Sequence, residues 1–297
     1  MILQGRSGNV SFIIRVEFRV VGGLSVTLMI VASIILAAGR GSRMKGYEGN
    51  KTLLPLIPGE PLFTGKNPML IHILQSLPEG PKALVVHHKK EEVKATTRSF
   101  RVTYCEQPVL NGTGGAILAA RKFIEDEASE SLIITMGDVP LVKSSTYARL
   151  AAQLQSSPFV VLGFRPSDKK QYGVLELHGR EVARIVEWKY WKTYSRERQD
   201  QLIICNSGIY AARTKDFLPY LARLEGSPHT VHKEREGKVV EFQEFFITDI
   251  VEFMRQDGLR VGYMVAENED EIMGVDDLIS LKKAQKLFQA SAFHSTR

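Results

Sequence analysis

The feature that most constrains the fold is an apolar run that ends in a basic, glycine-rich turn. Ile34-Ile35-Leu36 is followed closely by Ala38-Gly39-Arg40-Gly41-Ser42-Arg43-Met44. Such a run is typical of a parallel strand that is buried on both faces. The glycines let backbone N–H groups approach anionic oxygens, and Arg43 and the nearby Lys51 supply positive charge. The sequence therefore predicts a polyphosphate-binding turn at the end of a buried strand.

Two better-known phosphate motifs fit this segment less well. The dinucleotide fingerprint needs a third glycine at the position of Met44. A Walker-type loop needs Gly-Lys-Ser/Thr, which neither residues 46–51 nor Gly65-Lys66-Asn67 supplies. The other interpretation is a plain glycine turn with solvated basic side chains, and the rest of the chain must decide between the two.

Apolar strand patterns alternate with helical patterns from Met29 to about Arg165. We expect strands at residues 30–36, 83–87, 101–105, 132–136 and 159–164, and helices at 69–77, 91–99, 115–127 and 144–155. This alternation predicts an α/β fold with a mostly parallel sheet. Ligands of such sheets bind at the carboxyl ends of the strands, where Gly39, Gln107 and Asp138 fall.

The pattern changes after Arg165. Strands are predicted at residues 172–177, 182–188 and 202–211, and helices at 214–224, 242–255 and 277–290. We expect one domain over residues 29–297. Residues 29–165 would form its nucleotide-binding part, and residues 166–297 a smaller mixed-β lobe followed by C-terminal helices.

Composition limits the partners and the compartment. The chain has 297 residues and a net charge of +6, which suits anionic small molecules. Its basic residues are scattered, so we expect no nucleic-acid partner. The two cysteines form no Cys-x-x-Cys pair, which indicates a reducing cytoplasm and argues against structural zinc.

The N-terminal segment resembles a signal sequence or a membrane anchor, because residues 20–38 are almost continuously apolar and follow Arg6, Arg15 and Arg19. Its second half, however, is the strand that must lead into the phosphate turn. We therefore expect no membrane segment. The hypothesis is that translation begins at Met29 and that residues 1–28 are a non-native or disordered extension.

Two further motifs carry chemistry. Gln107 precedes Asn111-Gly112-Thr113-Gly114-Gly115, where a glycine-rich helix entry offers backbone N–H groups and the glutamine amide suits a pyrimidine edge. The alternative is a simple loop with a cap at Thr113. Asp138 follows a predicted strand and is placed to bind Mg²⁺, although it could be only a turn former.

The motifs described so far resemble, in this order, the signature of the sugar-1-phosphate nucleotidyltransferases. They are Leu36–Met44, Lys51, Gln107, Gly112-Thr113 and Asp138. Within that family they are similar to the pyrophosphorylase domain of bacterial N-acetylglucosamine-1-phosphate uridyltransferase. The resemblance runs from about residue 30 to about residue 281 and includes Tyr172-Gly173, Ile185-Val186-Glu187-Trp188-Lys189, Asn206-Ser207-Gly208 and Gly274-Val275-Asp276-Asp277. The chain lacks the hexapeptide repeats of an acetyltransferase β-helix.

The resemblance implies a Rossmann-like fold and Mg²⁺-dependent transfer of a nucleotidyl group from UTP to a sugar 1-phosphate such as N-acetylglucosamine 1-phosphate. It also implies roles for individual residues. These are Arg43 and Lys51 in catalysis; Leu36, Ala37, Ala38, Gly39, Lys51, Gln107, Gly112 and Thr113 in nucleotide binding; Gly137, Gly173, Glu187, Lys189 and Asn206 in sugar binding; and Asp138 and Asp276 as metal ligands. Asp277 could cap the last helix. The segment 244–250 would be a helix that mostly packs, lining the core and the sugar pocket without taking part in the chemistry.

The chain departs from the family pattern at several places. Asn50 replaces a proline, Asp276-Asp277 replaces two asparagines, and the segment 188–198 is longer and more aromatic. Other substrates therefore stay open: dTTP with glucose 1-phosphate, CTP with a phospho-alcohol, or GTP with a cofactor. A non-catalytic sugar-nucleotide sensor is the alternative from another class, and a dehydrogenase is a weaker one.

Overall fold

The structure is a computed structural model, and it describes residues 17–19, 25–27, 30–127, 129–235 and 238–294. Met29, where we expect translation to begin, lies outside the described residues, as does most of the segment before it. Within that segment, β1 (Glu17–Arg19) and β2 (Ser25–Thr27) pair as antiparallel strands. Among the described residues, no helix combines the length and the apolar character that crossing a bilayer requires.

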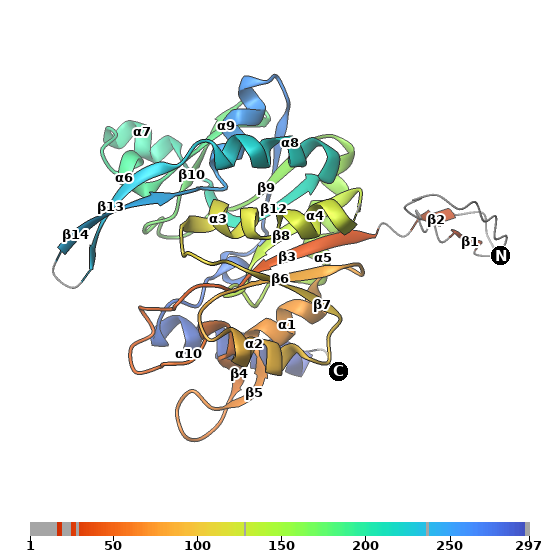
Figure 1. Ribbon diagram of the computed structural model, residues 1–297, viewed down its shortest axis with the longest axis vertical. Helices are drawn as coiled ribbons and strands as arrows, with labels where there is room; N and C mark the ends of the chain where they lie inside the picture. The colour runs from red at the N-terminus through yellow and green to blue at the C-terminus, as the bar shows by residue number, and fades with distance from the viewer. Residues whose placement is uncertain (1–16, 20–24, 28–29, 128, 236–237, 295–297) are drawn as a thin grey trace.

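A nine-stranded sheet forms the centre of the described fold (Figure 1). Its strands are β3 (Val31–Leu36), β6 (Lys82–Val86), β7 (Val102–Glu106), β8 (Ser131–Met136), β9 (Phe159–Phe164), β10 (Val174–His178), β11 (Glu181–Val186), β12 (Cys205–Arg213) and β15 (Val261–Val265). They lie in the order β11-β10-β12-β8-β3-β6-β7, while β9 pairs with both β12 and β15. The pairs β3–β6, β3–β8 and β6–β7 are parallel, so the carboxyl ends of these four strands share one edge.

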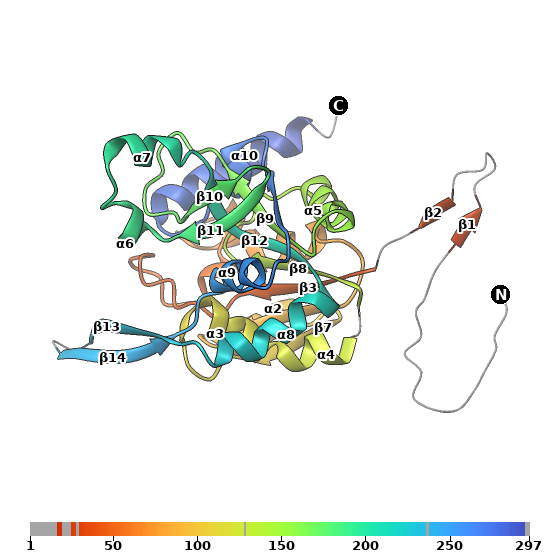
Figure 2. The same ribbon diagram turned by 90° about the horizontal axis from the view of Figure 1, so that it is seen from above.

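Helices cover both faces of the sheet (Figure 2). On one face lie α3 (Gly112–Ala119), α4 (Arg121–Glu127), α8 (Thr214–Glu225) and α9 (Asp249–Gln256); on the other lie α1 (Met69–Ser76), α2 (Lys90–Thr97) and α5 (Ser144–Ala152). Side chains of β3 alternate between the two cores: Ile34 faces the first set of helices and Ile35 the second. Burial on both faces explains why this strand is a continuous apolar run.

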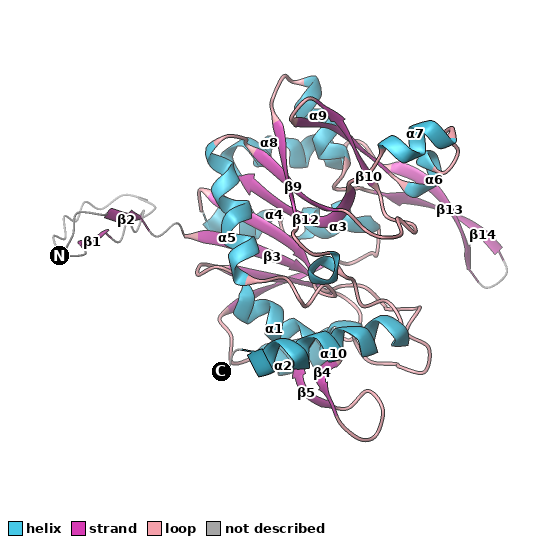
Figure 3. Ribbon diagram, turned by 180° about the vertical axis from the view of Figure 1, so that it is seen from behind, coloured by secondary structure: helices cyan, strands magenta, loops and turns pink. Residues whose placement is uncertain are grey.

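A third apolar cluster lies beside the sheet, where the C-terminal helix α10 (Leu278–His294) packs on the hairpin of β4 (Pro55–Pro58) and β5 (Gly65–Pro68) (Figure 3). Met44 is buried in this cluster with Leu54, Val275 and Leu281. The residue that excludes the dinucleotide fingerprint therefore anchors the end of the glycine turn in a small core.

The alternation predicted for residues 29–165 is confirmed, and each of its five strands lies within one residue of the prediction. In the second half, β10 and β11 continue the main sheet through the pairing of Val174 with Cys205. A separate antiparallel hairpin, β13 (His229–Arg235) and β14 (Lys238–Glu244), projects from the body of the protein (Figures 1 and 3).

Two predicted elements of the second half are wrong. The helix expected over residues 242–255 begins only at Asp249, because Phe242 pairs with Val231 and belongs to β14. For the same reason the segment 244–250 is not one helix. Trp188 does not end a strand but begins the short helix α6 (Trp188–Trp191), which α7 (Arg196–Gln201) follows.

Candidate active site

Four charged side chains meet at the carboxyl edge of the sheet. Lys51 Nζ donates hydrogen bonds to Asp138 Oδ2 at 2.6 Å and to Asp276 Oδ1 at 2.8 Å. Arg43 Nη1 donates to the other oxygen of Asp276 at 3.1 Å. The side chain of Lys51 is only 11% exposed, whereas that of Arg43 is 73% exposed. Lys51 is therefore held in place, whereas the exposed Arg43, although it is paired with Asp276, can be reached by a ligand.

The charges of this cluster stabilise one another. Burial lowers the pKa of the Lys51 ammonium, but the attraction and hydrogen bonds of Asp138 and Asp276 outweigh burial, so that this pKa lies above its usual value. The four formal charges cancel, which reduces the cost of placing them at a partly buried edge. The arrangement keeps Lys51 protonated and keeps the two carboxylates close to one positive centre.

Asn50 and Gly41 position Lys51. The buried Asn50 amide donates to the carbonyls of Ala37 at 3.2 Å and His88 at 2.8 Å, while its Oδ1 accepts from Thr52 N and Thr52 Oγ1. This caps the turn Lys51–Leu53. Gly41 has a φ of +63°, and a Cβ there would lie 2.8 Å from Cβ of Lys51. The lysine side chain passes over the turn because this position has no side chain.

Asp276 reaches the sheet from far along the chain, and the backbone fixes its position. Val275 N donates to the Asp138 carbonyl at 2.8 Å, so the segment before α10 is tied directly to the end of β8. Asp277 Oδ1 accepts from Ser280 N at 2.8 Å, and Ser280 Oγ accepts from Asp277 N at 3.0 Å. Asp277 therefore caps α10, as predicted.

The predicted nucleotide-binding residues Leu36, Ala37, Ala38 and Gly39 lie at the end of β3, and Gly137, which was predicted to bind the sugar, lies beside them at the end of β8. Gly137 N donates to the Leu36 carbonyl at 2.9 Å, and a Cβ on Gly137 would lie 3.2 Å from Cβ of Ala37. A Cβ on Gly39, in contrast, would meet no protein atom within 4 Å. Gly39 thus borders open space at the end of β3, whereas the preceding Ala38 is buried in the core.

Gln107, Gly112 and Thr113 form a second group. Gln107 is buried, and its Nε2 donates to Asn111 Oδ1 at 2.9 Å and to the Gly112 carbonyl at 3.3 Å. Thr113 Oγ1 accepts from Ile247 N at 3.3 Å. No hydrogen bond between described residues uses Gln107 Oε1, which leaves this oxygen as an acceptor for a ligand.

Phe245 braces the glycine-rich turn. Its N–H donates to the Asn111 carbonyl and its own carbonyl accepts from Gly114 N at 2.8 Å. Gly112 has a φ of +92°, and a Cβ on it would lie 2.4 Å from the Phe245 carbonyl oxygen. This glycine is therefore required by close packing of two backbones, whatever the turn binds.

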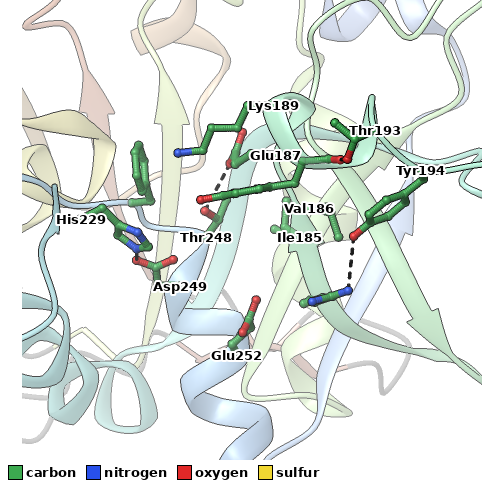
Figure 4. Close-up of a pocket in the computed structure, with 13 residues that line it drawn as sticks. Ile185, Val186, Glu187, Lys189, Thr193, Tyr194, His229, Thr248, Asp249 and Glu252 are labelled. Atoms are coloured by element: carbon green, nitrogen blue, oxygen red, sulfur yellow. Dashed lines mark hydrogen bonds and ion pairs between the residues drawn. The ribbon is translucent and has the colours of Figure 1, made fainter. Parts of the chain in front are cut away.

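The other predicted sugar-binding residues lie at the neighbouring ends of β10, β11 and β12. Asn206 N donates to the Gly173 carbonyl at 2.8 Å, and a Cβ on Gly173 would lie 3.5 Å from Glu187 Oε2. Glu187 and Lys189 line a cavity of about 560 Å³ (Figure 4). The side chain of Asn206 is engaged by Tyr210 and by Gly208 N.

Burial, above all, raises the pKa of Glu187, while a 3.3 Å hydrogen bond from Thr248 Oγ1 and the charge of Lys189 act in the opposite direction. The ammonium of Lys189 lies 4.7 Å from the ring centre of Tyr190 and 5.6 Å from that of Phe246. The cavity thus offers a half-buried carboxyl, an exposed ammonium and aromatic faces close together.

Tyr172 links the two regions. Burial raises its pKa, and the charges of Asp276 and Asp138 raise it further, which places its hydroxyl in the field of the acidic pair. The next residue, Gly173, adjoins Glu187. The segment Tyr172-Gly173 therefore lies near both the charged cluster and the cavity, although the described cavity wall contains none of Arg43, Lys51, Asp138 and Asp276.

His229, Phe246 and Asp249 line the cavity with Glu187 and Lys189. Phe246 and Asp249 belong to the segment 244–250, which was expected to line the core and the sugar pocket without taking part in the chemistry. His229 was not found from the sequence, because it begins a hairpin that was not predicted. No local pattern marks His229, because only the return of β14 brings it beside Asp249.

Together these features define the protein as a Rossmann-like α/β domain with a charged cluster suited to phosphates at the carboxyl edge of its sheet. The chain belongs to the MobA-like NTP transferase domain family, whose model matches residues 33–229. The family resemblance inferred from the motifs is thereby confirmed at the level of nucleotidyltransferases.

Individual relatives agree with this placement. The bifunctional protein GlmU of Rhodopseudomonas palustris is 32% identical over 264 residues, which cover 86% of this chain and 52% of the relative. GlmU of Syntrophotalea carbinolica is 33% identical over 263 residues, with coverages of 87% and 51%. The chain thus spans about half the length of these curated relatives.

Solved structures share the fold. The uridine diphosphate N-acetylglucosamine pyrophosphorylase of Trypanosoma brucei matches with a TM-score of 0.66 and 15% identity, covering 87% of this chain and 65% of its own. A putative glucose-1-phosphate thymidylyltransferase of Bacillus anthracis matches with a TM-score of 0.59 and 20% identity, covering 86% and 94%. The predicted nucleotidyltransferase fold is confirmed.

Proposed function

We propose that the protein catalyses Mg²⁺-dependent transfer of a uridylyl group from UTP to a sugar 1-phosphate, releasing pyrophosphate, with N-acetylglucosamine 1-phosphate as the first acceptor to test. The observation that carries this proposal is the convergence of Arg43, Lys51, Asp138 and Asp276 at one strand edge. The similarity to GlmU proteins over most of the chain supports the choice of substrates. The cytoplasm is the compartment we propose, because Cys105 and Cys205 are buried and unpaired.

The residues present fit a magnesium ion. Asp138 and Asp276 offer oxygens that already meet at one positive centre, and among the described residues no larger group of acidic, histidine or cysteine side chains competes with them. Two carboxylates completed by substrate phosphates and water are a common magnesium site. A bound Mg²⁺ would supply positive charge to the phosphate oxygens of the substrates.

The chain's own residues position and neutralise the phosphates. In the reaction, a phosphate oxygen of the sugar 1-phosphate bonds to the α-phosphorus of UTP, and the bond to the β-bridging oxygen breaks, so that the electron pair leaves with pyrophosphate. Lys51 and Arg43 balance the charge on the α-phosphate and the leaving group. The nucleophile is already ionised, so no side chain has to remove a proton, and catalysis depends on positioning and charge.

Uracil selection rests on Gln107. Because its Nε2 is committed to Asn111 and Gly112, the side chain presents Oε1 to a ligand. An acceptor at this position complements the imide N–H of uracil. Thymine carries the same imide group, so dTTP is the competitor that a test must include.

The test measures pyrophosphate release with UTP, dTTP, CTP and GTP against a panel of sugar phosphates, and identifies each product by mass. We expect UTP to give the fastest turnover, and chelation to abolish activity until Mg²⁺ is restored. Absence of turnover with every triphosphate would instead favour a sugar-nucleotide sensor, and preference for another triphosphate would contradict the assignment of UTP.

Two variants test the cluster itself. Lys51→Ala and Asp138→Asn should each lower kcat by about 100-fold or more, the scale of a lost charge-stabilising partner. Lys66→Ala is the matched control, because Lys66 is exposed on β5 and outside the cluster. Near-normal turnover of both site variants would reject these roles.

A further inference from the structure

The cavity that holds Glu187 and Lys189 also contains an oriented histidine. His229 Nε2 lies 2.8 Å from Asp249 Oδ2 (Figure 4). The ring centre of His229 lies 5.0 Å from that of Phe246. His229 comes from the first position of β13, where it pairs with Glu244, and Asp249 is the first residue of α9. The fold of the hairpin therefore brings an imidazole to the wall of the acceptor side.

Asp249 fixes the tautomer and the orientation of the His229 imidazole. A carboxylate accepts a hydrogen bond, so the contact places a proton on Nε2 and turns Nδ1 to the remaining side of the ring. Burial, above all, raises the pKa of Asp249, and the hydrogen bond and charge of His229 oppose that effect. Within the described residues Nδ1 has no hydrogen-bond partner, so it is available to a ligand.

The surroundings indicate what this ligand is. The charged side chains that line the cavity with His229 are Glu187, Asp249, Glu252, Lys189 and Arg184. Three acidic side chains therefore face two basic ones, and Arg184 is already paired with Glu176 outside the cavity wall, which disfavours an acceptor with an additional acidic group. Lys189 and His229 both contact the Phe246 ring, whose face suits a sugar ring.

We propose, on the basis of the function proposed above, that His229 is a specificity-determining residue whose Nδ1 binds a hydroxyl or amide N–H of a neutral hexose 1-phosphate. Asp249 is its positioning residue. In this proposal His229 contacts the sugar ring of the acceptor, and the triphosphate binds elsewhere, beside Gly39 and Gln107.

The experiment is calorimetric titration of the whole protein, with Mg²⁺ present, by UTP and separately by N-acetylglucosamine 1-phosphate and glucuronic acid 1-phosphate. His229→Gln keeps a donor for Asp249 but loses Nδ1, and His229→Ala loses both. His232→Ala is the matched control, since its side chain is 65% exposed on the same hairpin and outside the cavity.

We expect each His229 variant to weaken N-acetylglucosamine 1-phosphate binding about tenfold, the effect of one lost hydrogen bond, while its Kd for UTP stays unchanged. The wild-type protein should bind the glucuronic acid compound more weakly than the neutral sugar. Unchanged acceptor binding in His229→Ala, or an equal weakening of UTP binding, would overturn the inference.

Turnover separates this inference from the proposed function. If the wild-type protein binds the sugar phosphate, and His229 variants bind it weakly, but no triphosphate is turned over, the proposed catalysis fails and the recognition role stands. If the wild-type protein binds no neutral sugar phosphate, the recognition role is wrong.

Discussion

Replacing Asn50 with alanine should destabilise the protein strongly, because this buried side chain makes four hydrogen bonds at the active-site edge of the sheet. Its Nδ2 donates to the carbonyls of Ala37 and His88, and its Oδ1 accepts from the N–H and the hydroxyl of Thr52. Alanine would leave two carbonyls, an N–H and a hydroxyl without this partner at a buried position. It would also remove the cap of the turn that carries Lys51.

The expected loss follows from these contacts. At about 1 kcal/mol for each of the four hydrogen bonds, Asn50→Ala should lower the free energy of unfolding by about 4 kcal/mol, a large part of the roughly 5–15 kcal/mol that holds a domain folded. Asn50→Asp should be no better: it keeps both acceptors for Thr52 but turns an anionic oxygen toward the carbonyls of Ala37 and His88.

Equilibrium unfolding in urea, followed by circular dichroism, measures the effect. The exposed Glu48 supplies the control, and Glu48→Ala should change the free energy of unfolding by less than about 0.5 kcal/mol. If Asn50→Ala and Asn50→Asp unfold at the urea concentration of the wild type, the hydrogen-bond network assigned to Asn50 does not hold Lys51 in place.

Two further predictions concern Gly112 and Glu187. Gly112→Ala should cost about 2 kcal/mol or more of unfolding free energy, through its positive φ and the clash with Phe245. Gly258 also has a positive φ, of +79°, but a Cβ there meets no atom within 4 Å, so Gly258→Ala measures the cost of the backbone conformation alone. If both variants lose the same unfolding free energy, the clash with Phe245 does not contribute. Because the pKa of Glu187 is raised in the folded state, chiefly by burial, the folded protein binds a proton there that the unfolded chain releases. Stability therefore falls as pH rises from the usual glutamate pKa through the raised value. Glu187→Gln should then unfold at a higher urea concentration than the wild type near neutral pH, and the difference should narrow on acidification; a difference that is independent of pH would contradict this reasoning.

The parallel half of the sheet could be predicted because its strands are buried on both faces. A strand that is buried on both faces, such as the one with Ile34-Ile35-Leu36, is apolar at nearly every position, so the sequence itself shows where it begins and ends. The hairpin β13–β14 could not be predicted in this way. Its residues are mostly polar, and the apolar spacing around Phe242 suits a helix until the pairing with Val231, made across the turn, is known.

The candidate site divides in the same manner. Asp138 was predicted from its place after a strand, and Lys51 from its charge beside a glycine turn. Asp276 came only from the family resemblance, because nothing near it in the sequence shows that Val275 bonds to the end of β8. His229 was missed altogether, since its role depends on a contact with Asp249, which lies 20 positions away.

In the short segment 245–249 after β14, the main chain and the side chains have different structural roles. Main-chain groups of Phe245 support the loop next to Gln107, whereas the side chains of Phe246 and Asp249 form part of the cavity wall. Peptide groups stay the same when side chains are exchanged. If the proposed function holds, substitutions at residues 246 and 249 would change which sugar is accepted, while the main-chain support of the loop next to Gln107 would stay the same.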